Sequence, residues 1–301
     1  MKLVTVIGSI STDFVVTTGV VPEQGETLFG ETFTTFNGGK GSNQAVAASR
    51  IGAKVKMIGA VGDDVFGSEV LANLSENKID ITGVKQVKGG QTGAATIIVH
   101  EGDNRIIYVP GANNQLTIAD IDRQRETLKN SDIVVMQNET PKEVIEYTIE
   151  LCHELKVPTI LNPAPAREIS LALIDKLTYL TPNESEFAVI FPAGELVETL
   201  RNYPNKLIVT LGSRGAVFYD GQEIQQIPAY KVTPVDTTGA GDTFNGALAV
   251  ALSNGLSLAE GIQFSNLASS LAVQVSGAQA GIPSLAMMKG QNEYAKKWDF
   301  K

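Results

Sequence analysis

Two kinds of hydrophobic pattern alternate along most of the chain. Nearly continuous apolar runs, typical of strands buried on both faces of a sheet, occupy residues 3–7, 55–58, 133–136, 159–161 and 207–211. Apolar side chains at helical spacing lie between these runs, in residues 42–51, 67–77 and 141–156. The alternation predicts a three-layer α/β core in which these runs form the central strands of a sheet and the helices flank it.

Two other stretches, residues 14–36 and 93–109, follow a different pattern. They alternate apolar and polar residues, contain Gly-Glu and Gly-Asp-Asn turn signals, and have no convincing helix. We expect antiparallel strands here that pair into a small sheet and act as a lid. The predicted division is therefore a lid of residues 14–36 and 93–109 on a core of residues 1–13, 37–92 and 110–301.

Composition and charge exclude some classes of function. Hydrophobic residues make up 43% of the 301 residues and charged residues 19%, which is a globular balance. The net charge is -9 without a cluster of Lys and Arg, so we expect no nucleic-acid partner. The longest apolar runs are shorter than the ~20 residues that cross a bilayer, so we expect no membrane insertion. A single cysteine and a strand-like start, without a leader pattern, favour the cytoplasm.

Residues 236–244, Asp-Thr-Thr-Gly-Ala-Gly-Asp-Thr-Phe, place small residues and a carboxylate before an apolar helical stretch. Gly239, Ala240 and Gly241 leave backbone N–H groups uncovered, and such donors at a helix N-terminus attract anions. The carboxylate of Asp242 could accept the proton of a hydroxyl group that attacks a phosphate. The same residues are also compatible with a capped helix after a tight turn, and this alternative stays open.

A second glycine-rich segment, residues 37–43 with the sequence Asn-Gly-Gly-Lys-Gly-Ser-Asn, also precedes a predicted helix. Its glycines allow a ligand to approach the backbone, and Lys40 and Asn43 add a cation and an amide. A surface lysine in a flexible turn is the simpler interpretation of this segment alone. Neither a P-loop nor a dinucleotide-binding glycine motif after the first strand is found, so both standard nucleotide motifs are excluded.

Several motifs along the chain occur in the order found in one enzyme family. They are residues 8–13 (GSISTD), 38–45 (GGKGSNQA), 59–67 (GAVGDDVFG), 162–165 (NPAP), 183–186 (NESE), 210–215 (TLGSRG), 236–244 and 277–279 (GAQ). By these motifs, over nearly its whole length, the chain resembles the ribokinase-like carbohydrate kinases. The resemblance implies an ATP-dependent sugar kinase with an α/β core and a β-sheet lid.

By this resemblance Asp242 is the catalytic base, and Gly239, Ala240 and Gly241 form an anion hole for the transferring phosphoryl group. The positions that match the sugar-binding residues of the family are Ser11, Asp13, Gly39, Lys40, Asn43, Glu139 and Asp242. Carboxylates and amides suit this role because they form hydrogen bonds with hydroxyl groups. Ser11 departs from the family, which usually has Asn there, so its shorter side chain either loses a sugar contact or makes it through water.

The resemblance also implies an ATP site and two kinds of cation. The positions that match the ATP site are Asn183, Thr210, Gly212, Ser213, Gly215, Gly241 and Asn266. Asn183 and Glu186 would position magnesium largely through water, as suits an ion that dehydrates reluctantly. An activating potassium ion would lie beside the anion hole, held by Asp236 and by carbonyl groups at Thr238, Ala272, Val275, Gly277 and Gly281.

The resemblance therefore implies phosphorylation of D-ribose at O5 by ATP. The nearest alternative is another kinase of this family, acting on deoxyribose, fructose or a nucleoside, and Ser11 favours it. The alternative from a different class is a sugar or nucleotide sensor without turnover, against which an intact Asp242 argues. Because a second lid could protect the edge and outer face of the first, we also expect a homodimer.

Overall fold

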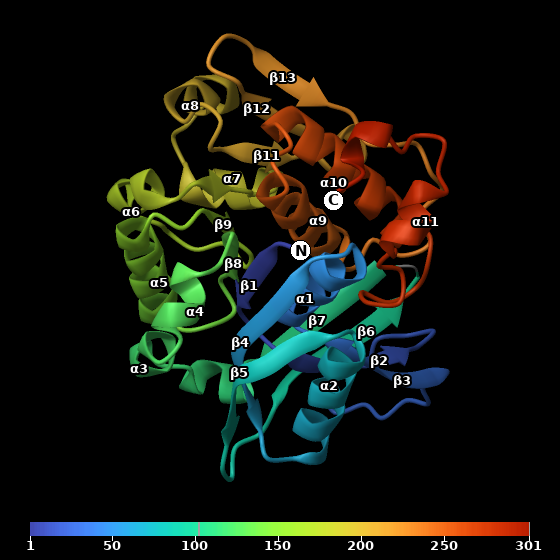
Figure 1. The fold of residues 1–301 in the computed structure, drawn as a ribbon. Helices are drawn as coiled ribbons and strands as arrows, with labels where there is room; N and C mark the ends of the chain where they lie inside the picture. Colours follow the sequence, from blue (N-terminus) through green and yellow to red (C-terminus); the bar gives the residue numbers. More distant parts are fainter. Residues whose placement is uncertain (102, 301) are drawn as a thin grey trace.

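The computed structural model describes residues 1–101 and 103–300, and its centre is a parallel six-stranded sheet (Figure 1). Across the sheet the strands run in the order β10 (Tyr179–Leu180), β9 (Thr159–Asn162), β8 (Ile133–Gln137), β1 (Leu3–Ile7), β4 (Lys54–Gly62) and β5 (Ile79–Val87). Every neighbouring pair in this sheet is parallel. The apolar runs predicted at residues 3–7, 55–58, 133–136 and 159–161 are therefore strands of the core.

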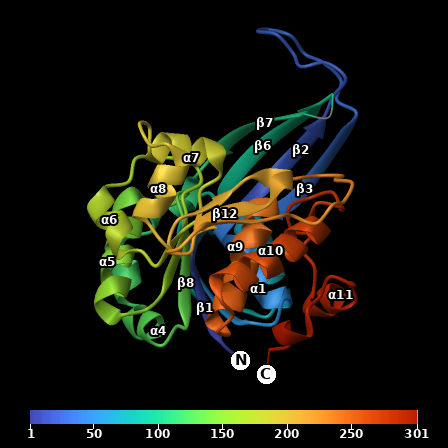
Figure 2. The same ribbon diagram turned by 90° about the horizontal axis from the view of Figure 1, so that it is seen from above.

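Helices cover both faces of the six-stranded sheet, which confirms the three predicted layers (Figures 1 and 2). One face packs against α1 (Lys40–Arg50), α2 (Val65–Glu76), α9 (Ala240–Ser253), α10 (Leu258–Ala272) and α11 (Leu285–Lys289). The other face packs against α3 (Ile118–Asp122), α4 (Arg125–Lys129), α5 (Lys142–Leu155), α6 (Leu171–Lys176), α7 (Glu184–Ile190) and α8 (Leu196–Asn202). Along β1, Val4 and Val6 pack in the first layer and Ile7 in the second, so the strand is buried on both sides.

The predicted helices are present, with ends that differ by one or two residues from the pattern. The helix expected at residues 42–51 begins at Lys40, and the helix expected at residues 67–77 begins at Val65 because the carboxylate of Asp64 caps it by accepting the N–H of Gly67 at 2.8 Å. Short 3₁₀ turns add η1 (Gly111–Gln115), η2 (Gly212–Arg214) and η3 (Lys296–Trp298). No helix within residues 1–101 and 103–300 combines the length and hydropathy needed to span a membrane.

The run at residues 207–211 was predicted as a central strand, and this assignment is wrong in part. It forms β11 (Ile208–Thr210), which pairs antiparallel with β12 (Ala216–Tyr219) and, through it, with β13 (Ile224–Ile227) in a separate three-stranded sheet. Two parallel bridges, from Leu180 to Leu207 and from Asn183 to Thr210, join β11 to the edge of the main sheet. The apolar run thus predicts a buried strand, but it does not predict which strand pairs with it.

A four-stranded sheet, the lid, projects from one end of the core (Figure 2). Its strand order is β3 (Thr32–Gly38), β2 (Ser11–Thr17), β6 (Gly93–His100) and β7 (Asp103–Val109). The outer pairs are antiparallel, as predicted, whereas β2 and β6 run parallel in the middle. Because β2 begins at Ser11, the strand crosses the boundary proposed at residue 13. Gly102 of the predicted Gly-Asp-Asn turn lies outside the described residues.

Side chains from the core hold two of the chain crossings between core and lid. Asn113 accepts the N–H of Ile10 at 3.0 Å and donates to its carbonyl at 2.8 Å, just before β2 begins. Asp64 accepts both the N–H of Thr92, at 2.9 Å, and its hydroxyl group, at 2.6 Å, just before β6 begins. The 59–67 motif, for which no role was predicted, therefore fastens the base of the lid.

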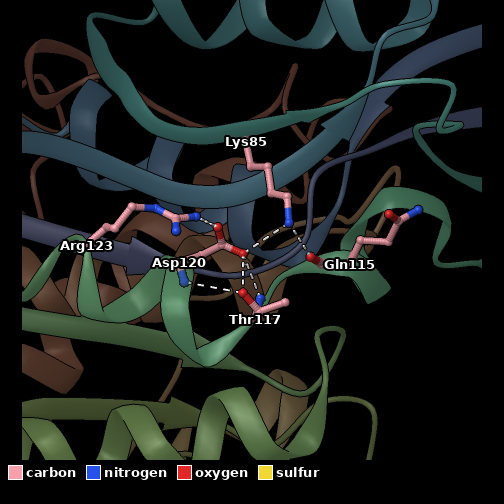
Figure 3. A network of polar contacts seen from close by, with 5 residues as sticks. All are labelled: Lys85, Gln115, Thr117, Asp120 and Arg123. Atoms are coloured by element: carbon pink, nitrogen blue, oxygen red, sulfur yellow. Dashed lines mark hydrogen bonds and ion pairs between the residues drawn. The ribbon is translucent and has the colours of Figure 1, made fainter.

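A polar network secures the segment that follows η1 to the edge strand β5 (Figure 3). Asp120, which is buried, accepts the N–H of Thr117 at 2.9 Å and its hydroxyl group at 2.7 Å, and forms ion pairs with Lys85 and Arg123. Lys85 also donates to the carbonyl of Gln115 at 2.9 Å. These contacts fix the chain directly after η1, and thus support the turn that carries Asn113.

Candidate active site

Asp242 lies in the first turn of α9 and is only 6% exposed. Its Oδ2 atom accepts the side-chain amide of Asn43 at 2.9 Å, and its Oδ1 atom accepts that of Gln44 at 3.0 Å. Within the described residues, α9 has no side-chain cap, so the capping alternative for Asp242 is wrong. The carboxylate is instead fixed by two donors from α1 and keeps lone pairs for a further hydrogen bond.

The backbone in front of Asp242 is only partly free to bind an anion. Gly239 has a left-handed φ of +77°, and a Cβ atom there would lie 2.8 Å from the carbonyl oxygen of Ala278, so this turn requires glycine. The N–H of Ala240 donates to the carbonyl of Thr237 at 3.2 Å. A Cβ atom on Gly241 would meet no described atom within 4 Å. An anion can therefore approach at Gly241, whereas Ala240 could contribute only after its present hydrogen bond is exchanged.

Lys40 is the single cation in a group of four carboxylates. Burial by itself would lower its pKa, but Asp242, Glu139, Glu186 and Asp13 outweigh this effect and raise the pKa. The ammonium group therefore stays charged, and it interacts electrostatically with carboxylates from α9, α7, β2 and the loop after β8. The interpretation of Lys40 as a surface lysine in a flexible turn is wrong.

Glu139, which follows β8, connects two of the glycine-rich motifs. Its Oε2 atom accepts the hydroxyl group of Ser9 and the backbone N–H of Lys40, the latter at 3.1 Å. Burial raises the pKa of Glu139, although Lys40 and Ser9 act in the opposite direction. The carboxylate thus fixes the start of α1 beside the end of β1.

Asp13 and Ser11 point to the same side of β2, and their side chains are 3.5 Å apart. Burial, followed by the charge of Glu139, raises the pKa of Asp13 to about 6. A Cβ atom on Gly38 would lie 2.2 Å from the carboxylate of Asp13, and one on Gly39, where φ is +90°, would lie 2.8 Å from the carbonyl oxygen of Ser9. The two glycines are therefore needed for space as well as for conformation.

Tyr108 belongs to this group of residues but was not predicted. It lies opposite Ala95 on β6, and Ala95 lies opposite Asp13 on β2, so the three residues form a row across the lid. Its hydroxyl group accepts the amide of Asn113 at 3.1 Å, and its pKa is raised by burial, Glu139 and Asp13. No local motif marks this tyrosine, because only the strand register places it there.

The residues predicted for ATP lie around the junction of the two core sheets. Asn183 and Thr210 face each other in a backbone bridge, and the N–H of Thr210 donates to the carbonyl of Pro182 at 2.9 Å. Gly212 and Ser213 follow in the exposed turn η2, where a Cβ atom on Gly212 would meet nothing within 4 Å. This exposed backbone is accessible to a planar or phosphorylated ligand.

Gly215 and Asn266 have structural contacts at this junction. A Cβ atom on Gly215 would lie 2.0 Å from the carbonyl oxygen of Ile227, so a side chain cannot be accommodated there. The buried amide of Asn266 donates to the carbonyl groups of Ile227 and Pro228 at 3.1 and 3.0 Å. The two N–H donors of Asn266 already have partners, so in this conformation they do not reach a nucleotide directly. Asn266 can contribute to a nucleotide site by fixing the segment after β13.

Asn183 and Glu186 form a reciprocal cap at the start of α7. The side chain of Asn183 accepts the N–H of Glu186 at 2.8 Å, and one carboxylate oxygen of Glu186 accepts the N–H of Asn183 at 2.9 Å. The second carboxylate oxygen stays available to water. Among the described residues no group of three or more His, Cys, Asp or Glu side chains could hold a metal ion. This donor set fits a magnesium ion that keeps most of its ligands as water and phosphate oxygen atoms.

Asp236 fastens the turn before α9 to the loop after α10. Its two carboxylate oxygens accept the N–H groups of Thr238 and Gly277, both at 2.8 Å. Burial would raise the pKa of Asp236, but these donors lower it. A Cβ atom on Gly281 would lie 2.1 Å from the carbonyl oxygen of Ala272. The structure thus places Asp236 in contact with Thr238 and Gly277, and Ala272 beside Gly281 and Val275, whose N–H donates to the Ala272 carbonyl at 3.3 Å. Carboxylate and carbonyl oxygen atoms are the ligand type that suits a hard cation.

A cleft of about 390 Å³ separates the lid from these loops. Asp13 lies in its wall, together with apolar and threonine side chains of β2, β3 and β6, and with Asp236, Thr238 and Gly277 on the opposite side. The cleft therefore reaches Asp13, one of the predicted sugar contacts, and the turn before Asp242. Its position between lid and core is where a small polar substrate would be covered.

Comparison with known proteins places this arrangement in a family. Residues 1–285 match the pfkB family of carbohydrate kinases. The chain belongs to this family. The resemblance predicted from the motifs is thereby confirmed, and so is the α/β fold with its lid.

Relatives in the pfkB family share nearly the whole length of the chain. It is 47% identical to the ribokinase of Lactococcus lactis subsp. lactis over 97% of both chains, and 45% identical to the ribokinase of Bacillus subtilis over 94% of this chain and 97% of that one. The structure of Arabidopsis thaliana ribokinase in complex with ribose and ATP covers 100% of both chains with a TM-score of 0.87 and 29% identity. This pfkB kinase thus resembles ribokinases in sequence and in fold.

Proposed function

We propose that this chain transfers the γ-phosphoryl group of ATP to O5 of D-ribose, giving ribose 5-phosphate and ADP. The named ribokinases among its relatives support the choice of sugar, and the complex of the Arabidopsis ribokinase supports both substrates. One observation carries the proposal for the chemistry. It is the buried carboxylate of Asp242, held by two amide donors beside the open backbone of Gly241.

Ribose would bind between the lid and the start of α1. Asp13 and Glu139 would accept its hydroxyl groups, and Lys40 and Asn43 would donate to its oxygen atoms. The charge of Lys40 lowers the pKa of both carboxylates, although burial raises it more. Covering the sugar with the lid would exclude water, which competes with the sugar as phosphoryl acceptor.

Transfer would occur at the N-terminus of α9. Asp242 would accept the proton of the attacking hydroxyl group while the oxygen approaches the γ-phosphorus in line with the leaving group. The N–H of Gly241 and the positive end of the helix dipole would stabilise the charge of the transferring group. A magnesium ion bound through Asn183 and Glu186 would neutralise phosphate charge, and potassium beside Asp236 would order the anion-hole turn.

Another acceptor remains the alternative, and Ser11 is the observation that favours it. Its hydroxyl group is 3.5 Å from Asp13, and the side chain is 1% exposed. A contact with a sugar therefore requires either a small movement of Ser11 or a bridging water molecule. A kinase that prefers deoxyribose, fructose or a nucleoside would be compatible with this position.

A panel of acceptors tests the proposal. ADP release is measured with magnesium and ATP, at constant ionic strength in potassium or sodium, with D-ribose, 2-deoxyribose, fructose and a nucleoside. We expect the highest kcat/KM with ribose and faster turnover in potassium. A higher kcat/KM for another acceptor would identify that acceptor, and not ribose, as the preferred substrate. Equal rates in the two salts would reject the proposed potassium site. The absence of sugar-dependent ADP release would reject the proposed kinase activity towards these sugars.

We also propose that two copies pair through their lids. Large apolar side chains are exposed on the face of this small sheet that lies away from the cleft: Phe33 is 65%, Ile107 65% and Val109 55% exposed. Burying such a surface against a second copy would remove it from water and protect the strand edges. Light scattering should give twice the chain mass of 32.0 kDa, and Ile107→Asp should lower that mass. A monomer at micromolar concentration would contradict this proposal.

A further inference from the structure

Four glutamine and asparagine side chains are connected to Asp242 by hydrogen bonds, either directly or through other amides, and the predicted functions of this chain do not explain their positions. Gln44, Gln137 and Gln279 are almost fully buried, at 0%, 0% and 7% exposure, and Asn73 is half-buried. Gln279 belongs to the 277–279 motif and Gln44 to the 38–45 motif, so both lie in motifs whose other members have predicted roles. Most buried amides have partners at both ends, and so do three of these four. The exception is Gln137, whose buried Oε1 atom has no hydrogen-bond partner among the described residues.

The first chain of amides reaches Asp242 from α2. Asn73 donates to Oε1 of Gln279, Gln279 donates to Oδ1 of Asn43, and Asn43 donates to Oδ2 of Asp242, each at 2.9 Å. The order of donors is fixed at the far end, since an ionised carboxylate only accepts. Each amide therefore presents its NH₂ group towards Asp242 and its oxygen away from it.

The second chain reaches the other carboxylate oxygen from β8. Gln137 donates to Oε1 of Gln44 at 2.7 Å, and Gln44 donates to Oδ1 of Asp242 at 3.0 Å and to Oδ1 of Asn162 at 3.1 Å. Both acceptors face the NH₂ group of Gln44, so a flipped amide would place its oxygen against two others. The orientation of Gln44 is thus unique.

The backbone of Gln279 is also held, which makes this residue a rigid link. Arg50 donates to its carbonyl group at 2.6 Å, and the side chain of Gln279 donates to the hydroxyl group of Ser42 at 2.9 Å. Two residues earlier, Gly277 is bound by Asp236, which is part of the turn before α9. Gln279 therefore connects the loop after α10 with the donor that holds the carboxylate.

We propose that Gln44 and Gln279 are positioning residues for Asp242: two converging chains of amides, one on each oxygen, fix the rotation of the carboxylate that receives the proton. Hydrogen bonds in such chains polarise one another, so the terminal donors are stronger than isolated amides. With one lone pair of each oxygen occupied, the remaining lone pairs point in fixed directions towards the substrate. The inference rests on the proposed role of Asp242 as the base.

Steady-state kinetics of Gln44→Met and Gln279→Met, with Gln274→Met as control, test this proposal. Gln274 is an exposed glutamine near the same loop. Loss of one hydrogen bond to a charged group is expected to lower kcat about 10- to 100-fold in Gln44→Met, with the KM for sugar changed less than about threefold. Gln279→Met should lower kcat about tenfold, and the control should keep it.

A double-mutant cycle tests whether Gln279 acts through Asn43. In an Asn43→Ala background, Gln279→Met should change kcat less than about twofold, because the side chain of Asn43 that connects Gln279 to Asp242 is already absent. Gln279→Glu keeps an acceptor for Asn73 but faces Asn43 with a carboxylate, so it should lower kcat even if the methionine variant fails to fold. Normal kcat in Gln44→Met and Gln279→Glu, or an equal loss in both backgrounds, would overturn the inference.

The same series separates this inference from the proposed function. If Asp242→Asn is inactive while the glutamine variants turn over normally, only the positioning role fails. If Asp242→Asn turns over normally, the proposed base itself is wrong.

Discussion

Replacing Asp242 by asparagine is expected to lower kcat by ~100-fold or more, while ATP and sugar still bind. The amide has nearly the size of the carboxylate but cannot accept the proton of the attacking hydroxyl group. It also introduces an NH₂ group where Asn43 and Gln44 both present donors, so one of these hydrogen bonds is lost. Steady-state ADP release gives kcat, and calorimetry of ligand binding shows whether the site is intact.

An aspartate far from the site provides the matched control. Asp220 lies in the turn between β12 and β13, where it accepts backbone N–H groups of Gln222 and Glu223. Asp220→Asn should leave kcat unchanged. Turnover of Asp242→Asn close to that of the unmodified chain, with both ligands bound, would reject Asp242 as the principal base.

Asp13→Asn is expected to stabilise the fold and to weaken sugar binding at the same time. The pKa of Asp13 in the folded state is about 6, against 3.8 for an ordinary aspartate, so the folded state binds its proton more tightly than the unfolded state. The ionised carboxylate therefore destabilises the fold above pH 6, and this effect disappears as the pH falls towards 4. At pH 8 the asparagine variant should unfold with a free energy higher by about 1–3 kcal/mol.

The same substitution should raise the KM for sugar about 10- to 100-fold, because a charged acceptor of hydroxyl groups is lost. In the unmodified chain, kcat/KM for sugar should fall as the pH drops through about 6 and Asp13 becomes protonated. Denaturant unfolding at pH 8 and pH 5 and steady-state kinetics measure both effects. Asp175→Asn, at an exposed aspartate of α6 outside the cleft, should change neither quantity. Equal stability and equal KM in Asp13→Asn would contradict the assignment.

Local patterns predicted most of the framework. Buried parallel strands such as β1 and β8 are continuous apolar runs, so they are recognisable without knowledge of their partners. The edge strand β5 was missed because exposed and polar residues such as Asp80, Lys85 and Gln86 interrupt it. The misplaced strand at residues 207–211 shows the same limit, since pairing depends on residues far away in the chain.

The motifs predicted which residues would gather at the site, but not how they are held. Asp242, Lys40 and Glu139 come together as the resemblance implied. The donors that orient them do not follow from any motif spacing, because Gln279 and Asn43 are 236 residues apart and Tyr108 is placed only by strand register. Such contacts depend on the packed tertiary structure, and a linear pattern carries no signal for them.

The hydrogen bonds of Asn113 to Ile10 and of Asp64 to Thr92 hold the lid at the end where it joins the core. The opposite end of the sheet is therefore the end that can move. Seven-residue β2 is about 20 Å long, so a tilt of the sheet by about 10° about its root would carry the free end through ~3.5 Å. Asp13, only two residues from the start of the strand, would travel ~1 Å. Tilting would therefore widen the entrance of the cleft and leave Asp13 almost in place. A sugar could then enter while the residues that accept its hydroxyl groups keep their positions.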